Sequence, residues 1–205
     1  MALQVWLPLN GNLNNQGLAD VTVTNNGATV DANGKIGSCY SFDGTNDYIS
    51  GSYTTSVNQS FCCWVYFIAL KTGHVFDART PSGVGYQPIY INGNSIQIGG
   101  SGGGYATFSY TWEIGKWYHV CVTHDEAVGK LYINGVLINQ STTAKGKDMG
   151  EANFTLGCRC NSTNFENVKL NDVRIYDHAL STREVAELAK GLVLHYPLND
   201  AYYTG

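Results

Sequence analysis

Residues 130–138 read Lys-Leu-Tyr-Ile-Asn-Gly-Val-Leu-Ile, and this stretch decides the fold class. Apolar residues alternate on both sides of Asn134-Gly135, and Asn-Gly is the strongest short signal for a two-residue turn between antiparallel strands. Residues 88–98 repeat the same scheme around Asn92-Gly93. The chain is therefore predicted to contain two antiparallel β-hairpins.

Further strands are predicted on both sides of these hairpins. Residues 61–68 and 117–124 carry apolar side chains on both faces of an extended chain, as central strands of packed sheets do. Other strands are expected near 3–9, 38–43, 46–50, 74–78, 105–110, 153–157 and 168–176. About a dozen short strands without a long helix predict an all-β fold, a two-sheet antiparallel β-sandwich of jelly-roll type.

One short C-terminal helix is expected after Ser181. Residues 181–184 read Ser-Thr-Arg-Glu, a capping box in which Ser181 and Glu184 each satisfy a backbone N–H of the first turn. Val185 and Leu188 then share one face, and Gly191 is a suitable C-terminal stop.

Composition limits the class of protein and the partners. The chain has 205 residues, of which 43% are hydrophobic, enough for one domain with its own core. Only 14% are charged and 24 are glycine, which is typical of a turn-rich sheet protein and excludes a helical bundle or a disordered tail. The net charge of −4, without a run of Lys or Arg, argues against nucleic acid or an anionic membrane as partner.

The N-terminus and the cysteines indicate the compartment. Residues 1–8 have neither a basic start nor a long apolar run, so no signal peptide and no membrane insertion are predicted, and synthesis in a cytoplasm is expected. Cys62, Cys63 and Cys121 lie in apolar runs and are expected to be buried thiols. Residues 158–160 read Cys-Arg-Cys, which is not the C-x-x-C spacing of zinc or redox sites.

A repeated segment suggests a domain boundary. Residues 192–199 match residues 3–10, with Leu, Pro, Leu and Asn identical. We interpret residues 1–190 as one sandwich domain and residues 191–205 as the start of a second repeat or a linker. The alternative is a chance match, in which residues 192–199 form a last strand of the first domain.

Several segments together resemble a known family. Residues 7–17, 34–49, 115–120, 131–137 and 170–181 are similar to the pattern of the LamG-like branch of the concanavalin A-like lectin/glucanase superfamily. The resemblance covers about residues 3–190 and implies a concanavalin A-like jelly roll. In style the chain is also similar to tail or other virion appendage proteins of phages. That likeness implies location in a virion after synthesis in a host cytoplasm.

The resemblance also implies a metal. Members of the family often hold one structural calcium ion between the N-terminal loop and the last strand, and the matching positions here are Asp172, Asn14 and Asp43. Asparagine stands where acidic residues are common in the family, which lowers the charge of the ligand set. The alternative is that Asp172 only forms hydrogen bonds with loop backbone.

Candidate ligand-binding residues combine aromatic rings with polar side chains, as sugar sites do. Two rims are predicted, at residues 79–86 and 99–110, with Arg79, Tyr86, Tyr105 and Tyr110 in them and Trp112 just beyond. The alternative is that these aromatic residues only pack on the sandwich.

The carboxylates do not indicate catalysis. Glycosidases need two carboxylates across the scissile bond, whereas Glu113 and Glu166 are isolated and Asp125 and Glu126 are adjacent, on opposite faces of a strand. The sequence therefore predicts a non-enzymatic module. The likeness to phage appendage proteins implies that this module belongs to a virion appendage, with a surface carbohydrate or a neighbouring virion protein as partner. A ligand-free spacer and a glycoside hydrolase are the alternatives, and self-association into a homo-oligomer is compatible with the sequence.

Overall fold

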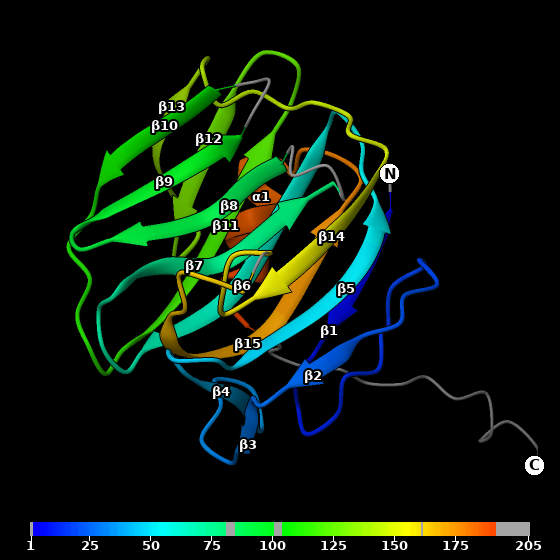
Figure 1. Cartoon of the computed structure of the whole chain (residues 1–205). Helices are drawn as coiled ribbons and strands as arrows, with labels where there is room; N and C mark the ends of the chain where they lie inside the picture. The colour runs from blue at the N-terminus through cyan, green and yellow to red at the C-terminus, as the bar shows by residue number, and fades with distance from the viewer. Residues whose placement is uncertain (1, 81–84, 101–103, 161, 192–205) are drawn as a thin grey trace, which may run out of the picture.

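The computed structural model describes residues 2–80, 85–100, 104–160 and 162–191, without the side chains of residues 86 and 87. These residues form two antiparallel β-sheets stacked face to face (Figure 1). The predicted two-sheet sandwich is confirmed.

The eight-stranded sheet has the spatial order β13 (Val136–Ser141), β12 (Gly129–Ile133), β11 (Trp117–His124), β6 (Gln59–Phe67), β15 (Asn167–Tyr176), β4 (Cys39–Asp43) and β3 (Thr29–Asp31), with β1 (Leu3–Leu7) also paired to β15. The seven-stranded sheet has the order β10 (Gly104–Ser109), β9 (Ser95–Gly100), β8 (Gly85–Asn92), β7 (Thr72–Arg79), β14 (Glu151–Leu156), β5 (Tyr48–Thr54) and β2 (Thr24–Asn26).

Both predicted hairpins are present, but the turn of the second hairpin is shifted by one residue. In the β12–β13 hairpin, Asn134 and Gly135 have φ angles of 51° and 81°, as a type I′ turn requires. The β8–β9 hairpin turns one residue later than predicted, because Asn92 still pairs with Ser95 and Gly93 supplies the positive φ of 55°.

β2 and β3 have no counterpart among the predicted strands. Each is three residues long, and they lie on either side of Gly27 and Ala28 but belong to different sheets. Gly27, with a φ of 92°, therefore turns the chain from one sheet to the other and does not close a hairpin. Strands this short carry too little alternation to be recognised from sequence.

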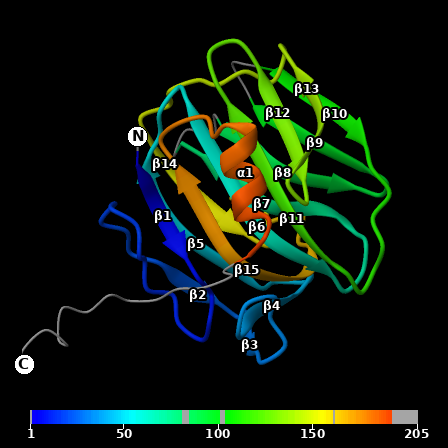
Figure 2. The ribbon, with the colours of Figure 1, turned by 180° about the vertical axis from the view of Figure 1, so that it is seen from behind.

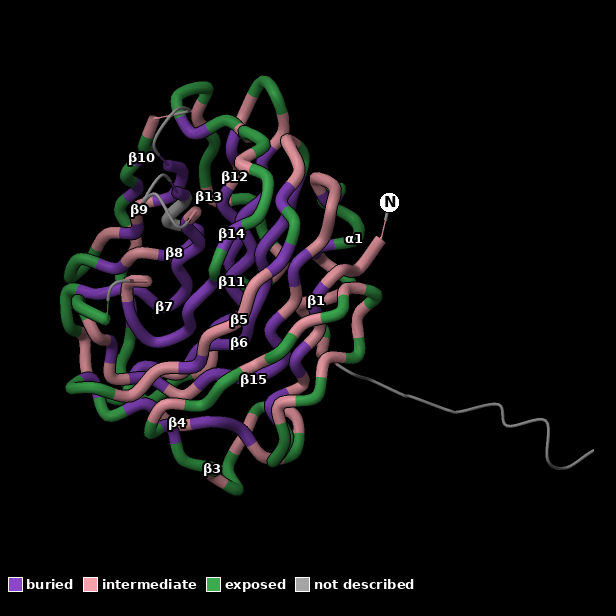
Figure 3. The backbone as a smooth tube through the Cα atoms, turned by 45° about the vertical axis from the view of Figure 1, so that its right-hand side comes forward, coloured by how far each residue is buried: buried purple, intermediate pink, exposed green. Residues whose placement is uncertain are grey.

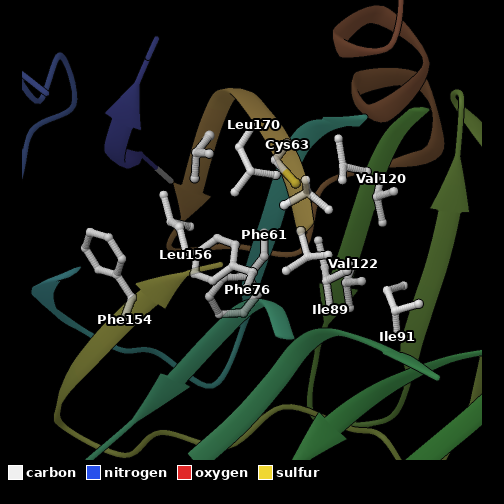
Figure 4. Packing of buried hydrophobic residues seen from close by; sticks show 14 of the residues in the cluster. Phe61, Cys63, Phe76, Ile89, Ile91, Val120, Val122, Phe154, Leu156 and Leu170 are labelled. Atoms are coloured by element: carbon white, nitrogen blue, oxygen red, sulfur yellow. The ribbon is translucent and has the colours of Figure 1, made fainter. Parts of the chain in front are cut away.

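The hydrophobic core fills the space between the sheets. Buried residues concentrate in the central strands, whereas loops and edge strands are largely exposed (Figure 3). Phe61 of one sheet contacts Phe76 of the other edge to face, with ring centroids 5.2 Å apart, and Phe154 packs beside Phe76 (Figure 4).

Helix α1 (Thr182–Leu188) covers the outer face of the eight-stranded sheet (Figure 2). It begins with the predicted capping box, in which Ser181 and Glu184 bond each other's backbone. Beneath it, Val185 packs on Cys62 and Cys121 in a second apolar cluster. This cover explains why β6 and β11 are apolar on both faces.

A β-bulge in β15 reverses which residues face outward. Asn171 pairs with Trp64, but Arg174 pairs with Cys62, so β15 holds one extra residue at this point. The extra residue is Asp172, whose φ of 53° is uncommon outside glycine. After the bulge Val173 points into the core and Arg174 points outward, opposite Trp6 of β1.

Asn171 ties three segments of the chain together. Its side chain is fully buried; Nδ2 donates to the carbonyl oxygens of Pro8 and Ser38 at 2.8 and 3.0 Å, and Oδ1 accepts from the Ile36 backbone N–H at 2.7 Å. One amide therefore fixes the N-terminal loop and the loop before β4 against β15.

The described residues leave the domain prediction open. Residues 192–205 lie outside the described residues, so the second repeat stays a prediction. In the part of the chain that is described, no helix is long and apolar enough to span a bilayer.

We expect Asn171→Asp to lower the free energy of unfolding by about 3 kcal/mol or more, because two buried carbonyls lose their donor and face a carboxylate. Urea denaturation measures the change. Asn139→Asp, the same change at an exposed position of β13, should stay within about 0.5 kcal/mol. Equal losses of unfolding free energy from both substitutions would contradict the role of Asn171 in holding the two loops against β15.

Candidate functional site

Two rows of polar side chains cross the outer face of the seven-stranded sheet. In β14, Phe154 and Leu156 point into the core, so Asn153 and Thr155 point outward. Strand register places Arg79, Asn153 and Ser52 in one row, and Asp77, Thr155, Ser50 and Thr24 in the next. We call these seven residues the polar rows.

The polar rows end in a buried ion pair. Arg79 Nε donates to Asp77 Oδ2 at 2.7 Å, and the two residues are 8% and 0% exposed. The Cys160 backbone N–H also donates to Asp77 Oδ2, at 3.0 Å. Asp77 Oδ1 forms no hydrogen bond within the described residues, and His74 Nε2 lies 3.8 Å from it. Buried charges are costly unless they are paired, and here the pair lies on the face of the sheet that points away from the core.

The loop of residues 157–166 borders the polar rows. Thr155 Oγ1 donates to the carbonyl of Cys158 at 2.7 Å, which holds the loop against β14. Burial raises the pKa of the Cys160 thiol to about 12, so this thiol is protonated at neutral pH and is a poor nucleophile.

A groove of about 320 Å³ lies over the polar rows between β2, β5, β14 and this loop. Its wall is almost entirely small or hydroxylated and includes one aromatic ring, that of Tyr48; the lining residues are Thr22, Thr24, Tyr48, Ser50, Gly51, Ser52, Asn153, Thr155, Cys160 and Ser162. Such a surface offers many hydrogen-bond donors and acceptors and little charge.

Three of the predicted ligand residues belong to this sheet. Arg79 is brought into the polar rows. Tyr105 is 43% exposed and points outward from β10, three strands and about 14 Å from β7. Tyr86 lies on β8 opposite Ala78, but its side chain is not among the described atoms. Residues 81–84 and 101–103 of the predicted rims lie outside the described residues.

The other two predicted ligand residues lie elsewhere. Trp112 is only 4% exposed and packs on Phe67 and Tyr118, at centroid distances of 5.0 and 5.2 Å. Tyr110 packs on Trp112, at 4.6 Å. Trp112 is therefore buried in the core and is not exposed as a rim would require, because the apolar space at this end of the core takes up its ring. Tyr110 is only partly buried beside it, and its binding role stays a prediction.

The three predicted metal ligands do not converge. Asp172 Oδ1 accepts from Trp6 Nε1 at 2.7 Å and from Arg174 Nε at 3.0 Å. Asp43 accepts a hydrogen bond from the Thr45 backbone N–H and caps a turn. It pairs with Asn167 of β15, five positions before Asp172, which places Asp43 about 15 Å from Asp172. Asn14 is exposed on the N-terminal loop. Among the described residues no group of three or more His, Cys, Asp or Glu could hold a metal ion.

Several site residues had no signal of their own in the sequence. Asn153, Thr155, Ser50 and Ser52 are ordinary outward positions of strands, and only their alignment across β5 and β14 makes a surface. Asp77 stands within an apolar run, His-Val-Phe-Asp-Ala, where a carboxylate is unexpected. Asp77 in this apolar run was therefore the one signal in the sequence that pointed to the polar rows.

The stacked sheets and the capping helix define a sandwich of the concanavalin A-like class. The family model described as the concanavalin A-like lectin/glucanases superfamily matches residues 43–186. This range covers more than half of the chain, so the chain belongs to that superfamily. No curated protein matches it in sequence.

Solved structures with a similar fold include binding domains. One is domain 4 of AbnA, a GH43 extracellular arabinanase from Geobacillus stearothermophilus, in complex with arabinotriose; the TM-score is 0.70 and the identity 23%, covering 92% of this chain and 98% of that one. Another is the botulinum neurotoxin serotype D binding domain, with a TM-score of 0.70, 16% identity and coverage of 94% and 52%.

A third is the binding domain of Paraclostridial Mosquitocidal Protein 1, with a TM-score of 0.69, 15% identity and coverage of 92% and 52%. The chain spans about half the length of the two toxin binding domains. At these identities the likeness concerns the fold alone.

The effect of Ca²⁺ on thermal stability tests whether a metal ion or the buried Asn171 amide holds the N-terminal loop to the last strand. We expect the melting temperature to be the same in excess EDTA and in millimolar Ca²⁺, because Asn171 already joins the N-terminal loop to the last strand. Differential scanning calorimetry measures it. A rise of several degrees with Ca²⁺ would instead confirm the calcium expectation.

Glu166 makes stability depend on pH. Its side chain is fully buried, and burial raises its pKa from 4.5 to about 7. The folded state therefore binds a proton more tightly than the unfolded state, and this stabilisation, present below about pH 4.5, is lost as the pH rises through 7.

Glu166→Gln should gain stability relative to the wild type between pH 5 and 8 by up to about 3 kcal/mol. Denaturant titrations at several pH values measure the difference, and Glu151→Gln, at an exposed position of β14, is the control. A difference that does not change with pH would contradict the raised pKa.

Proposed function

We propose that the chain is a non-catalytic carbohydrate-binding module that holds its sugar on the polar rows. The observation that supports this most is the groove of about 320 Å³ beside the buried Asp77–Arg79 pair. Asp77 holds Arg79 by an ion pair on β7, the strand next to the β14 wall of the groove.

The chemistry of the groove suits a neutral sugar. Hydroxyl and amide side chains act both as donors and as acceptors, as a polyhydroxylated ligand requires, and the Tyr48 ring can cover an apolar sugar face. The groove is lined by residues of β2, β5 and β14, so an oligosaccharide in it can contact several strands. The arabinotriose complex of the similar arabinanase domain supports sugar as the ligand class.

The arrangement of carboxylates supports binding without catalysis. A general acid must reach the glycosidic oxygen, whereas Glu166 is fully buried. Asp77 is bonded to Arg79 and to backbone, which favours a positioning role.

We extend the proposal to the setting of the module. Residues 192–199 repeat residues 3–10, which supports a multidomain protein in which sandwich modules follow one another. A tail or fibre of a virion, with the module facing a surface glycan or a neighbouring subunit, is the setting that we propose. The competing function is a spacer without a ligand.

A glycan array followed by titration calorimetry tests the binding function, with arabinotriose as the first defined probe. We expect Asn153→Ala to weaken binding about tenfold, since an exposed amide that bonds sugar is worth about 1–1.5 kcal/mol. Asn139→Ala, an exposed position of the other sheet, should bind as the wild type does.

A blank array with folded protein would favour the spacer function. Equal binding by Asn153→Ala and the wild type would place the sugar elsewhere. Release of reducing sugar from the bound glycans would instead indicate a hydrolase.

A further inference from the structure

A second cleft lies on the other side of the sandwich. It has a volume of about 400 Å³ and lies between β1, the N-terminal loop and β15; its lining residues are Trp6, Pro8, Asn10, Asn12, Gln16, Ile36, Asp172 and Arg174. Trp6 lies between the core residues Val5 and Leu7, so it points outward from the eight-stranded sheet. The cleft and the polar rows therefore belong to different sheets.

The floor of the cleft is built from three side chains that hold one another. Trp6 and Arg174 are cross-strand partners, and the guanidinium lies 4.7 Å from the centre of the Trp6 ring. Both side chains also donate to Asp172 Oδ1, the indole at 2.7 Å and the guanidinium at 3.0 Å. Two strands and the bulge thus fix the orientation of all three groups.

One acceptor remains open in this arrangement. Asp172 Oδ2 forms no hydrogen bond within the described residues, and it is not among the fully buried atoms. The carboxylate lines the cleft, so Oδ2 is an acceptor available to a ligand. The left-handed backbone of Asp172 is needed to place it there, and strained backbone of this kind is common at binding sites.

The wall of the cleft is also ordered before any ligand arrives. Asn15 Oδ1 accepts from the Trp6 backbone N–H at 2.7 Å, and its Nδ2 donates to the Ala19 carbonyl at 2.7 Å. At Gly17 an added Cβ would lie 2.3 Å from the Gln4 carbonyl oxygen, so only glycine fits. The N-terminal loop is therefore held against β1, and the exposed amide side chains of Asn10, Asn12 and Gln16 stand on this held backbone.

The charges and shapes define the ligand class. Asp172 and Arg174 compensate each other, so a charged ligand finds no unpaired partner of opposite sign. Asn10, Asn12 and Gln16 offer both donors and acceptors, while Trp6, Pro8 and Ile36 offer apolar surface. A rigid ligand with hydroxyl groups and one apolar face meets all of these requirements.

We infer that this cleft is a second carbohydrate site, for a neutral sugar whose hydroxyl group donates to Asp172 Oδ2. The inference goes beyond the proposed function, because it uses other residues on the other sheet. With both sites occupied, one module bridges two glycan strands, and the avidity for a dense glycan surface exceeds the affinity of either site.

Nuclear magnetic resonance distinguishes the two sites. The Trp6 indole N–H, which donates to Asp172, reports on the cleft, and the Asn153 side-chain amide reports on the polar rows. In a titration of the whole chain with arabinotriose and a panel of neutral monosaccharides, we expect the Trp6 signal to move and saturate. The Asn153→Ala variant should leave that saturation unchanged.

Gln16→Ala should weaken binding at the cleft three- to tenfold, about 0.6–1.4 kcal/mol, without affecting the polar rows. Gln140→Ala, at an exposed position of β13, is the matched control and should have no effect. A Trp6 signal that stays still while the Asn153 signal saturates would overturn the second site alone. Movement of neither signal with any sugar would overturn both sites.

Discussion

The bonds of the Asn171 amide are the interaction on which the rest of the structure depends. Three partners from two loops meet on one buried side chain of β15. Asn171 fills this junction. At the next residue, Asp172, a bulge interrupts the regular strand and reverses which side chains of β15 point outward. The core contact of Val173 and the outward position of Arg174 both follow from that reversal.

The two sheets use their outer faces differently. On the eight-stranded sheet, α1 covers Cys62 and Cys121, so β6 and β11 carry apolar residues on both faces at this point. The seven-stranded sheet has no described helix on it, and its outer face carries hydroxyl, amide and paired charged groups. The two proposed sites lie on different sheets of the sandwich, so the proposal of two sites is also a proposal of bivalent binding.

The aromatic residues show where prediction from sequence succeeds and fails. Trp112 and Tyr105 both look like binding-rim candidates in the sequence, since each is an aromatic residue next to polar residues in a predicted loop or edge segment. Trp112 is buried against Phe67, while Tyr105 is exposed on an edge strand. Local pattern cannot separate them, because burial depends on which distant strands close the end of the core. Arg79, predicted at the start of a loop, is the last residue of β7 and lies in the polar rows.

Alternation and turn chemistry in the sequence by themselves determined the sandwich, both hairpins and the capped helix, because these features depend on neighbours within a few residues. Only the tertiary structure decided the sites. Thr24, Ser50, Asp77 and Thr155 become one row through the pairing of four strands. Trp6 and Arg174 meet across 168 positions of the chain (174 less 6), through one antiparallel register. Such registers are set by packing of the whole core, which no local stretch of sequence contains.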